Sequence, residues 1–373
     1  MSMYIGVNNV ARKAEKVYVG VNGVARQALK VYVGVNGVAR LAYTASTKPV
    51  KQSNATALSV TNYMASSSVT GYAIFGGGYS GGYKTDVKAY NASLTQSTPT
   101  ALSVARSDFA AAKFRSNYTD HAVFGGGEIS GGTTGTVDAY NASLTRTTPT
   151  AMHNAKNFGA AQVGSSGTYV LFAGGTASSA LTTVTAYNYS FTKSTPTALS
   201  TARQQLSGAN NSKYAIFAGG YAGSTYYSVV EAYNSSLTKS TATSLSTARR
   251  QICAAKTSNG TYAVFAGGYT GSASKVVEAY NSSLTKTTAT ALSTARYNGA
   301  AVPLTGFIIF GGGNTTSVEV YNNSLTKTSI TSTLSNSGAA FGAYVPSSYY
   351  NADVGLIANG SYMSVYKLDL TSD

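Results

Sequence analysis

A segment beginning with Tyr-Asn recurs along most of the chain, and this repeat constrains the fold more than any other feature. Its copies begin at Tyr90, Tyr140, Tyr187, Tyr233, Tyr280 and Tyr321, with a degenerate copy at Tyr366. Spacings of 41 to 50 residues are typical of propeller blades or solenoid turns. Each unit holds four short strand-like runs separated by turn residues, without a sustained helical period. The sequence therefore predicts an all-β repeat protein.

Paired glycines follow the second strand-like run of each unit, as in TYAVFAGG at residues 261–268. A Tyr stands in the third run, and a basic residue precedes the first. This pattern resembles the Kelch repeat family, whose members fold as β-propellers. The Trp that Kelch repeats usually place after the Tyr is missing, since the chain has no Trp. The resemblance covers about residues 53 to 373 and implies an architecture rather than a function.

The two ends of the repeat array predict a closed ring. The final segment, SVYKLDLTSD, aligns with a third strand and the turn after it, whereas residues 54–59 (NATALS) match a fourth strand with no first three ahead of it. Together they would complete one blade, and such closure leaves no free sheet edge. We predict a seven-bladed, Kelch-like β-propeller over residues 46–373 with one blade shared between the termini.

Residues 1–45 contain a second repeat, with a period of 14 residues. Its copies begin at Tyr4, Tyr18 and Tyr32. Asn-Gly pairs at residues 22–23 and 36–37 are flanked by alternating Val, a strong β-hairpin signal because both turn positions need positive φ. Since a lone hairpin is barely stable, the hairpin module should pack on itself as a homo-oligomer, on the propeller, or on another protein. It looks like leading segments of bacteriophage structural proteins, which implies docking to other virion proteins.

The net charge of +15 raises the question of nucleic-acid binding. Five cations instead share one repeat position, in the turn after the third strand. They are Arg146, Lys193, Lys239, Lys286 and Lys327. This spacing predicts a ring of separated cations on one rim, which favours solubility over a nucleic-acid track. Nucleic acid is therefore not the expected partner.

A second set of cations directly precedes the innermost strand of each blade. Its members are Arg106, Lys156, Arg203, Arg249 and Arg296. Near the channel mouth they could receive an acidic ligand through charge-assisted bonds. However, the four units with Arg here also carry an acid two residues before the repeat Tyr. Those acids are Asp138, Glu231, Glu278 and Glu319. This co-variation favours pairs within each blade over a ligand site, and both readings stay open.

The connections between the second and third strands vary in length and sequence while the flanking strands repeat. They are rich in Tyr, Ser and Gly, a composition that suits recognition surfaces on a rigid framework. The tyrosines we assign to a ligand surface are Tyr79, Tyr83, Tyr221, Tyr226, Tyr227 and Tyr269. Tyr rings offer flat apolar area and a hydroxyl, and so suit sugar faces or protein patches. The alternative is that these segments are ordinary solvated turns.

Catalysis has little support in the sequence. The two histidines, His121 and His153, occupy unrelated repeat positions, so we expect no metal centre, no cofactor and no catalytic residues. Cys253 aligns with alanines of the innermost strand, which indicates a buried structural thiol. The N-terminal segment lacks an apolar signal-peptide core and no window has the length of a membrane span, so we expect synthesis in the cytosol without membrane insertion.

These observations predict a non-enzymatic binding protein. The setting they favour is a bacteriophage virion, as a tail or host-recognition component that binds a cell-surface glycan or protein through the loop face of the propeller. Two alternatives remain from other classes. One is a sugar-processing enzyme such as a Kelch-type sugar mutarotase, which could work with Arg and Glu alone, and the other is a cytosolic protein-interaction scaffold.

Overall fold

A computed structural model describes residues 3–7, 10–14, 18–21, 24–27, 30–35, 38–44, 48–51, 56, 62–115, 120–164, 167–328, 333–346, 352–359 and 362–369. All regular elements in these ranges are β-strands, as the repeat predicts. Within the same ranges, no helix is long and apolar enough to cross a membrane.

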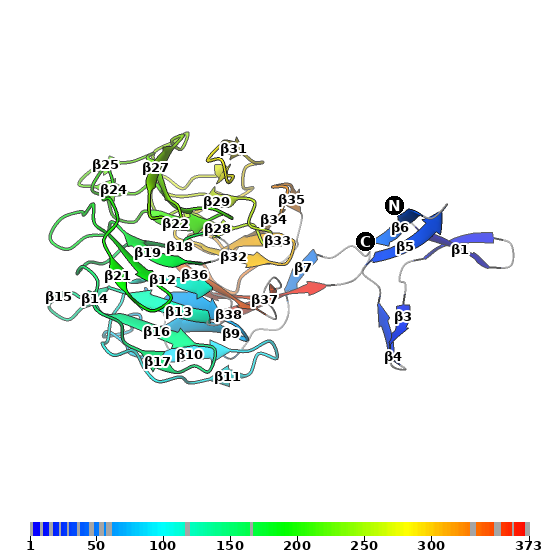
Figure 1. Ribbon diagram of the computed structural model, residues 1–373, viewed down its shortest axis with the longest axis horizontal. Helices are drawn as coiled ribbons and strands as arrows, with labels where there is room; N and C mark the ends of the chain where they lie inside the picture. Colours follow the sequence, from blue (N-terminus) through cyan, green and yellow to red (C-terminus); the bar gives the residue numbers. More distant parts are fainter. Residues whose placement is uncertain are drawn as a thin grey trace. The chain divides into compact units, whose positions relative to one another are not determined.

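Seven four-stranded sheets form seven blades around a common axis, and in chain order their colours run from cyan to red in Figure 1. Blade 1 holds β8 (Ala65–Val69), β9 (Tyr72–Gly76), β10 (Val87–Tyr90) and β11 (Gln96–Ser97). Blade 2 holds β12 (Ala110–Arg115), β13 (Asp120–Gly125), β16 (Val137–Asn141) and β17 (Arg146–Thr147). Blade 3 holds β18 (Gly159–Gln162), β19 (Tyr169–Ala173), β20 (Val184–Asn188) and β21 (Lys193–Ser194).

The remaining blades repeat this order from the innermost to the outermost strand. Blade 4 holds β22 (Ser207–Asn210), β23 (Ala215–Ala218), β26 (Val230–Tyr233) and β27 (Lys239–Ala242). Blade 5 holds β28 (Cys253–Lys256), β29 (Ala263–Ala266), β30 (Val277–Tyr280) and β31 (Lys286–Thr288). Blade 6 holds β32 (Ala300–Leu304), β33 (Phe307–Gly311), β34 (Val318–Asn322) and β35 (Lys327–Thr328). Blade 7 holds β36 (Ala340–Pro346), β37 (Ala352–Asn359), β38 (Tyr362–Asp369) and β7 (Lys48–Lys51). The chain is thus a seven-bladed β-propeller.

The shared blade is confirmed, but its outer strand lies earlier than the sequence predicted. That strand is β7, and not residues 54–59. Of the latter segment only Thr56 lies within the described residues, and it is not in a strand. The reason is visible in blade 1, where the equivalent residues 98–103 follow the two-residue strand β11. In blade 1 the run from Thr98 to Ser103 is the connection after the outer strand, because Pro99 cannot donate to a ladder and the strand ends before it.

The hydrophobic core lies between neighbouring blades. The second strand of a blade is buried on both faces, as in Ala263–Ala266 of β29. Residues from blades 4 and 5 form one such core cluster, in which Ile216 and Val230 meet Phe265 and Tyr280. Because both faces of a middle strand are covered, these strands read as continuous apolar runs instead of alternating ones.

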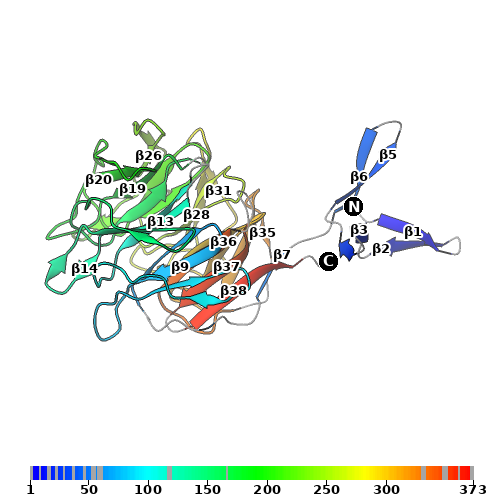
Figure 2. The same ribbon diagram turned by 60° about the horizontal axis from the view of Figure 1, so that its bottom comes forward.

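Blade 7 and blade 1 meet directly, which closes the ring. Ser66 Oγ donates to the Gly342 carbonyl at 2.8 Å, and the Tyr344 N–H donates to Ser68 Oγ at 3.2 Å. Phe75 and Tyr90 of blade 1 share a core cluster with Leu356 of blade 7. In the views of Figures 1 and 2, β36 lies beside β9.

In blades 1 to 6, the repeat Tyr joins the blade to the one before it. Tyr233 is fully buried, and its hydroxyl donates to the Thr197 carbonyl in the connection after blade 3 at 2.8 Å. Five other repeat tyrosines make the same bond at 2.6 to 2.8 Å; they are Tyr90, Tyr140, Tyr187, Tyr280 and Tyr321. Burial raises the pKa of the Tyr233 hydroxyl, so it remains a donor at neutral pH. We call this contact the Tyr latch.

Tyr233→Phe should lower the free energy of unfolding by about 1 kcal/mol, because it removes one hydrogen bond and leaves the packing of the ring in place. Urea denaturation followed by fluorescence measures the change. Tyr189→Phe is the matched control, because Tyr189 is 58% exposed and should show no measurable loss. Equal stability of the two variants would contradict a stabilising role for the latch.

Three hairpins precede the propeller in the sequence, as the three copies of the 14-residue repeat predict. They are β1 (Met3–Val7) with β2 (Val10–Ala14), β3 (Tyr18–Val21) with β4 (Val24–Gln27), and β5 (Lys30–Val35) with β6 (Val38–Thr44). The innermost pair of the second hairpin is Val21 with Val24. The chain divides into two compact units: Met1–Val50 with Lys367–Asp373, and Lys51–Tyr366.

Candidate functional site

The connections between second and third strands share one face of the propeller with the segments that lead into the innermost strands. Isolated β-bridges join the two sets: Ser107 pairs with Glu128, Gln204 with Tyr221, and Arg250 with Tyr269. Two connections form small hairpins, β14 (Glu128–Ile129) with β15 (Gly132–Thr133), and β24 (Tyr221–Ala222) with β25 (Thr225–Tyr226), which lie on the left in Figure 1. We call this surface the loop face.

Glycine doublets shape this face. The first glycine of each pair adopts positive φ, for example 68° at Gly219. A Cβ there would lie 2.3 Å from the carbonyl oxygen of Arg249 in the next blade, so only glycine permits this approach. The N–H of Gly220 then donates to that same carbonyl at 2.9 Å. The doublets therefore set the position of the segment that carries the predicted arginines.

Three of the predicted tyrosines surround one cation on the loop face. The Arg250 guanidinium carbon lies 4.2 Å from the ring centroid of Tyr221, 5.3 Å from that of Tyr269 and 5.7 Å from that of Tyr226. Tyr297 extends the group, with its ring centroid 5.1 Å from that of Tyr269. All five side chains are half-buried. We call these residues the Tyr-Arg cluster.

The Tyr-Arg cluster combines apolar ring area, hydroxyls and a fixed positive charge. Cation–π contacts hold the rings in place, so less side-chain entropy is lost when a ligand binds. Burial leaves Nε of Arg250 without a hydrogen-bond partner among the described residues. Such a surface suits a ligand with both an apolar face and hydroxyl groups.

Sequence reasoning missed Arg250 and Tyr297. Both directly follow a cation of the predicted arginine ring, at a repeat position that otherwise holds Ser107, Asn157 and Gln204. This position varies between blades while its neighbours repeat, and that variation is the signal that could have identified it.

The other predicted tyrosines lie outside this cluster. Tyr79 and Tyr83 of blade 1 form their own edge-to-face pair, with ring centroids 5.2 Å apart, and Tyr79 is 42% exposed. Tyr227 is half-buried, and its backbone bonds to Gly220 and Arg249. Lys156 pairs with Glu128 of blade 2 at 2.5 Å in a partly exposed bridge on the loop face.

The four arginines of the predicted ring are buried and paired. Arg106, Arg203, Arg249 and Arg296 are 0% exposed and form ion pairs of 2.8 to 3.0 Å with the acids of their own blades. A ligand role would need exposed guanidinium groups, so these pairs favour the structural reading. The predicted co-variation thus reflects direct contact within each blade.

Each buried carboxylate of these pairs also contacts a turn cation, which the sequence had predicted to face solvent. Glu278 lies 2.8 Å from Arg249 Nη1 and 3.2 Å from Lys286 Nζ, and it accepts the Ser246 N–H at 2.9 Å. Lys286 also donates to the Ser244 carbonyl at 2.8 Å. Lys193 of blade 3 is exposed and donates to the Ala151 carbonyl, whereas the other four turn cations each lie beside a buried carboxylate and are therefore more than solubilising charges. We call each such group a carboxylate triad.

Three of the triads lower the pKa of their glutamate. Burial alone would raise the pKa of Glu278, but the Ser246 N–H and the Arg249 charge outweigh it, and the net pKa lies below the usual value. The same holds for Glu231 and Glu319. Since the folded pKa is lowered, these groups contribute stability at neutral pH that is lost as pH falls through that pKa.

Blade 3 replaces the triad with a neutral pair. Thr185 stands at the acid position, and His153 stands at the position of the serine that caps the carboxylate elsewhere. His153 Nε2 lies 3.2 Å from the Gly174 carbonyl and therefore donates to it, which leaves Nδ1 to accept from the Thr185 hydroxyl at 2.8 Å. Burial lowers the pKa of His153, because no carboxylate is present to stabilise the charged ring.

Lowering pH should therefore weaken the fold through His153 before the triads respond. The unfolded state binds a proton near the ordinary histidine pKa of 6.5 while the folded state resists it, so the free energy of unfolding falls below that pH. Unfolding measured from pH 7 to pH 5 should show a smaller decrease in His153→Gln than in the parent protein. His121 also has a pKa lowered by burial. If the free energy of unfolding of His153→Gln fell with pH as steeply as that of the parent protein, His153 would not be the cause of the decrease.

The mouth of the central channel opens on the loop face beside these elements. In each of blades 1 to 6, one residue there has positive φ between 52° and 58°: Tyr63, Asp108, Asn157, Gln205, Gln251 and Asn298. Their backbones form a chain of hydrogen bonds, in which each N–H from Asp108 to Asn298 donates to the carbonyl of the previous member at 2.9 to 3.1 Å. We call this set the mouth ring.

The mouth ring lines a cavity of about 220 Å³ together with Phe109, Phe158 and Ile252. Oε1 of Gln205 is buried without a hydrogen-bond partner among the described residues. Burial raises the pKa of Asp108, although the Ser107 hydroxyl donates to it at 3.1 Å. Amide and carboxyl groups above apolar rings can accept and donate bonds to ligand hydroxyls.

Cys253 lies on β28 with 1% exposure, and burial raises its pKa, so it is a structural thiol as predicted. In the described part of the chain, no three His, Cys, Asp or Glu side chains gather in a way that could hold a metal ion.

Comparisons with known proteins return no matching family model and no matching curated protein. The seven-bladed propeller stands on the arrangement of its sheets, and kinship with Kelch proteins remains a resemblance in the repeat.

Proposed function

We propose that the protein is a non-enzymatic binding protein whose loop face binds a carbohydrate of a cell surface. The Tyr-Arg cluster carries this proposal, because it presents pre-arranged aromatic rings and hydroxyls around a fixed cation. The nearby mouth ring supports it by supplying amide and carboxyl groups at a cavity of about 220 Å³. Sugars combine an apolar ring face with hydroxyls, and so match both surfaces.

Arg250 and Gln251 link the two surfaces along the chain. The Arg250 side chain lies among the tyrosines, whereas the next residue, Gln251, lines the mouth cavity. One ligand could therefore contact both groups through adjacent residues. A glycan of more than one sugar unit fits this arrangement better than a single monosaccharide does.

The setting we favour is a bacteriophage virion, in a tail or host-recognition role. The support is the resemblance of the three N-terminal hairpins to leading segments of phage structural proteins. The hairpins would then dock to other virion proteins, and the Kelch-like propeller would meet the host. Finding the protein in purified particles by mass spectrometry would support this setting, and its absence from them would contradict it.

Glycan-array and cell-binding measurements test the binding role. The variant carrying Tyr221→Ala, Tyr226→Ala and Tyr269→Ala should lose most binding, because the loss of stacking costs affinity at each ring. Tyr189→Ala is the control, since this exposed residue follows β20 at the opposite end of its blade. Both variants should melt like the parent protein. Normal binding by the triple variant would overturn the assignment of the loop face.

A further inference from the structure

Arg250 differs from the other arginines of the propeller because it has no acidic partner. Each of the other arginine side chains that the structure describes makes an ion pair with Asp or Glu; they are Arg106, Arg146, Arg203, Arg249 and Arg296. Arg250 makes no ion pair with any described residue, and its Nε is buried without a hydrogen-bond partner in the same part of the chain. The three tyrosine rings attract the guanidinium through their faces, but unlike a carboxylate they carry no opposite charge.

Lys156 occupies the equivalent position before blade 3 and shows how a cation at this position can be neutralised. Both residues form an isolated β-bridge with the connection of their own blade. The side chain of each then contacts the residue that directly follows the glycine doublet of the preceding blade. For Lys156 that residue is Glu128, at 2.5 Å, and for Arg250 it is Tyr221, with the guanidinium carbon 4.2 Å from the ring centroid. The same arrangement thus holds an ion pair in one blade and a cation without a counter-charge in another.

The connections on either side of Arg250 supply no acid. Residues 219–229, 267–276 and 312–317 connect the second and third strands of blades 4, 5 and 6, and they contain no Asp or Glu. Their one charged residue is Lys275, which is exposed. These connections therefore add positive charge to the loop face around the cluster and no negative charge.

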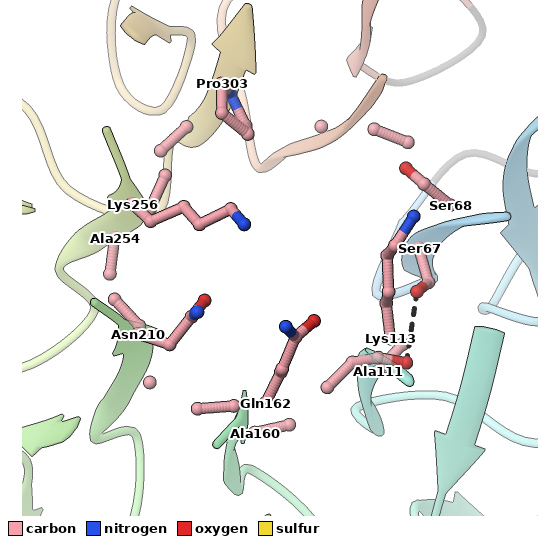
Figure 3. A pocket seen from close by; sticks show the side chains of 18 of the residues that line it. Ser67, Ser68, Ala111, Lys113, Ala160, Gln162, Asn210, Ala254, Lys256 and Pro303 are labelled. Atoms are coloured by element: carbon pink, nitrogen blue, oxygen red, sulfur yellow. Dashed lines mark hydrogen bonds between the residues drawn. The ribbon is translucent and has the colours of Figure 1, made fainter. Parts of the chain in front are cut away.

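Two cations inside the channel differ from Arg250, because both already have partners within the protein. Figure 3 shows Lys113 and Lys256 on the channel wall. Lys113 pairs with Asp120 at 3.0 Å, and its ammonium lies 5.5 Å from the ring centroid of Tyr344. Lys256 also has an interaction within the protein. Among these cations, the one that a ligand can neutralise is therefore Arg250.

The rings around Arg250 also leave their hydroxyl groups for a ligand. No hydrogen bond joins the hydroxyl of Tyr221, Tyr226 or Tyr269 to another residue in the described ranges. All three side chains are half-buried, so they are partly open to solvent. The Tyr-Arg cluster thus places neutral donors and acceptors next to an unneutralised cation.

We propose that the carbohydrate bound by the Tyr-Arg cluster is acidic, and that Arg250 binds its carboxylate or phosphate group. This inference rests on the carbohydrate role proposed above and specifies the class of ligand. Guanidinium N–H groups match the oxygens of carboxylates and phosphates in bidentate pairs. A neutral sugar would leave the charge of Arg250 without a counter-charge. The tyrosine rings and hydroxyls would contact the sugar that carries the acid.

A glycan array with matched acidic and neutral members tests the class of ligand. The pairs are oligogalacturonate with its methyl ester, 3′-sialyllactose with lactose, and mannose 6-phosphate with mannose. The acidic member of at least one pair should bind about tenfold more tightly than its neutral partner, because it adds charge-assisted hydrogen bonds. The first two pairs present a carboxylate and the third presents a phosphate, so the array also distinguishes these two groups.

Variants at two positions test whether Arg250 is the cause of this preference. Arg250→Gln should abolish the preference for the acidic member. Tyr221→Glu should do the same with Arg250 intact, because it places a carboxylate where Glu128 neutralises Lys156. Tyr221→Gln is the matched control, since it loses the same ring but should keep the preference.

Lys275→Met is the control for overall charge. It removes an exposed cation from the connection of blade 5 and should also keep the preference. Thermal melting of each variant checks that the propeller remains folded.

Each remaining outcome would count against the proposal in a different way. Equal binding of the acidic and neutral members by the parent protein would overturn the acidic ligand and leave the carbohydrate role in place. Binding to no glycan on the array would overturn both. A preference that persists in Arg250→Gln, or that falls as much in Lys275→Met, would show that Arg250 is not the group that binds the acid.

Discussion

Arg249→Met is expected to lower the free energy of unfolding by about 3 to 5 kcal/mol, the usual effect of breaking a buried ion pair. Its carboxylate partner, Glu278, is 0% exposed and would lose a contact of 2.8 Å. Lys286 would still contact that carboxylate, but its side chain is partly exposed and its position is fixed by a backbone carbonyl. Urea denaturation of the purified variant measures the loss.

The double variant Arg249→Met with Glu278→Gln should recover part of this stability. It removes the uncompensated charge, and blade 3 already shows that a blade can hold a neutral pair at this site. The coupling between the two changes is therefore expected to be large, whereas independent sites would add. A strictly additive double variant would contradict the pairing.

Removing residues 1–51 should prevent the propeller from folding as a soluble monomer, whereas removing residues 1–45 should not. The longer deletion takes away β7, the fourth strand of the seventh sheet. A strand edge that loses its neighbour exposes unpaired backbone groups and promotes aggregation. Light scattering and thermal melting of the two purified proteins measure the difference.

The shorter deletion is the matched control, because it removes all three hairpins and leaves β7 in the chain. It should melt cooperatively, at nearly the temperature of the parent protein. If the two truncated proteins had equal melting temperatures and both stayed monomeric, β7 would be dispensable. That result would contradict closure by a strand from the N-terminal segment.

The repeat predicted most of the fold because its recurring residues each have a structural role. The glycine doublets mark a backbone position that no Cβ can occupy, as at Gly219, and the repeat Tyr marks an interblade bond. The outer strands were harder to locate. They are as short as two residues, as in β17, and their pairing is set by the preceding Asn turn more than by their own side chains.

The candidate site was less predictable. The tyrosines were predicted from the composition of the loops, but three of them pack around Arg250. Arg250 directly follows the buried Arg249, so the sequence did not distinguish it from the buried arginines. The sequence analysis also treated the two sets of cations as independent, although one cation of each set contacts the same carboxylate, as Arg249 and Lys286 contact Glu278. These contacts join segments about 30 residues apart and depend on the register between strands, which cannot be determined from a single sequence.

The Tyr latch has a consequence for how such a chain can change its length. Each contiguous copy from blade 2 to blade 6 carries a hydroxyl donor for the copy before it, and its bond is accepted by a carbonyl of that earlier copy, as Tyr187 and Tyr233 illustrate. A copy gained by tandem duplication would therefore already contain both the hydroxyl donor and the carbonyl acceptor that it needs to bond to its neighbours. Recombination within the array could add or remove whole units without any new bonding pair having to arise. The shared seventh sheet is the exception, because its two gene segments would have to be inherited together.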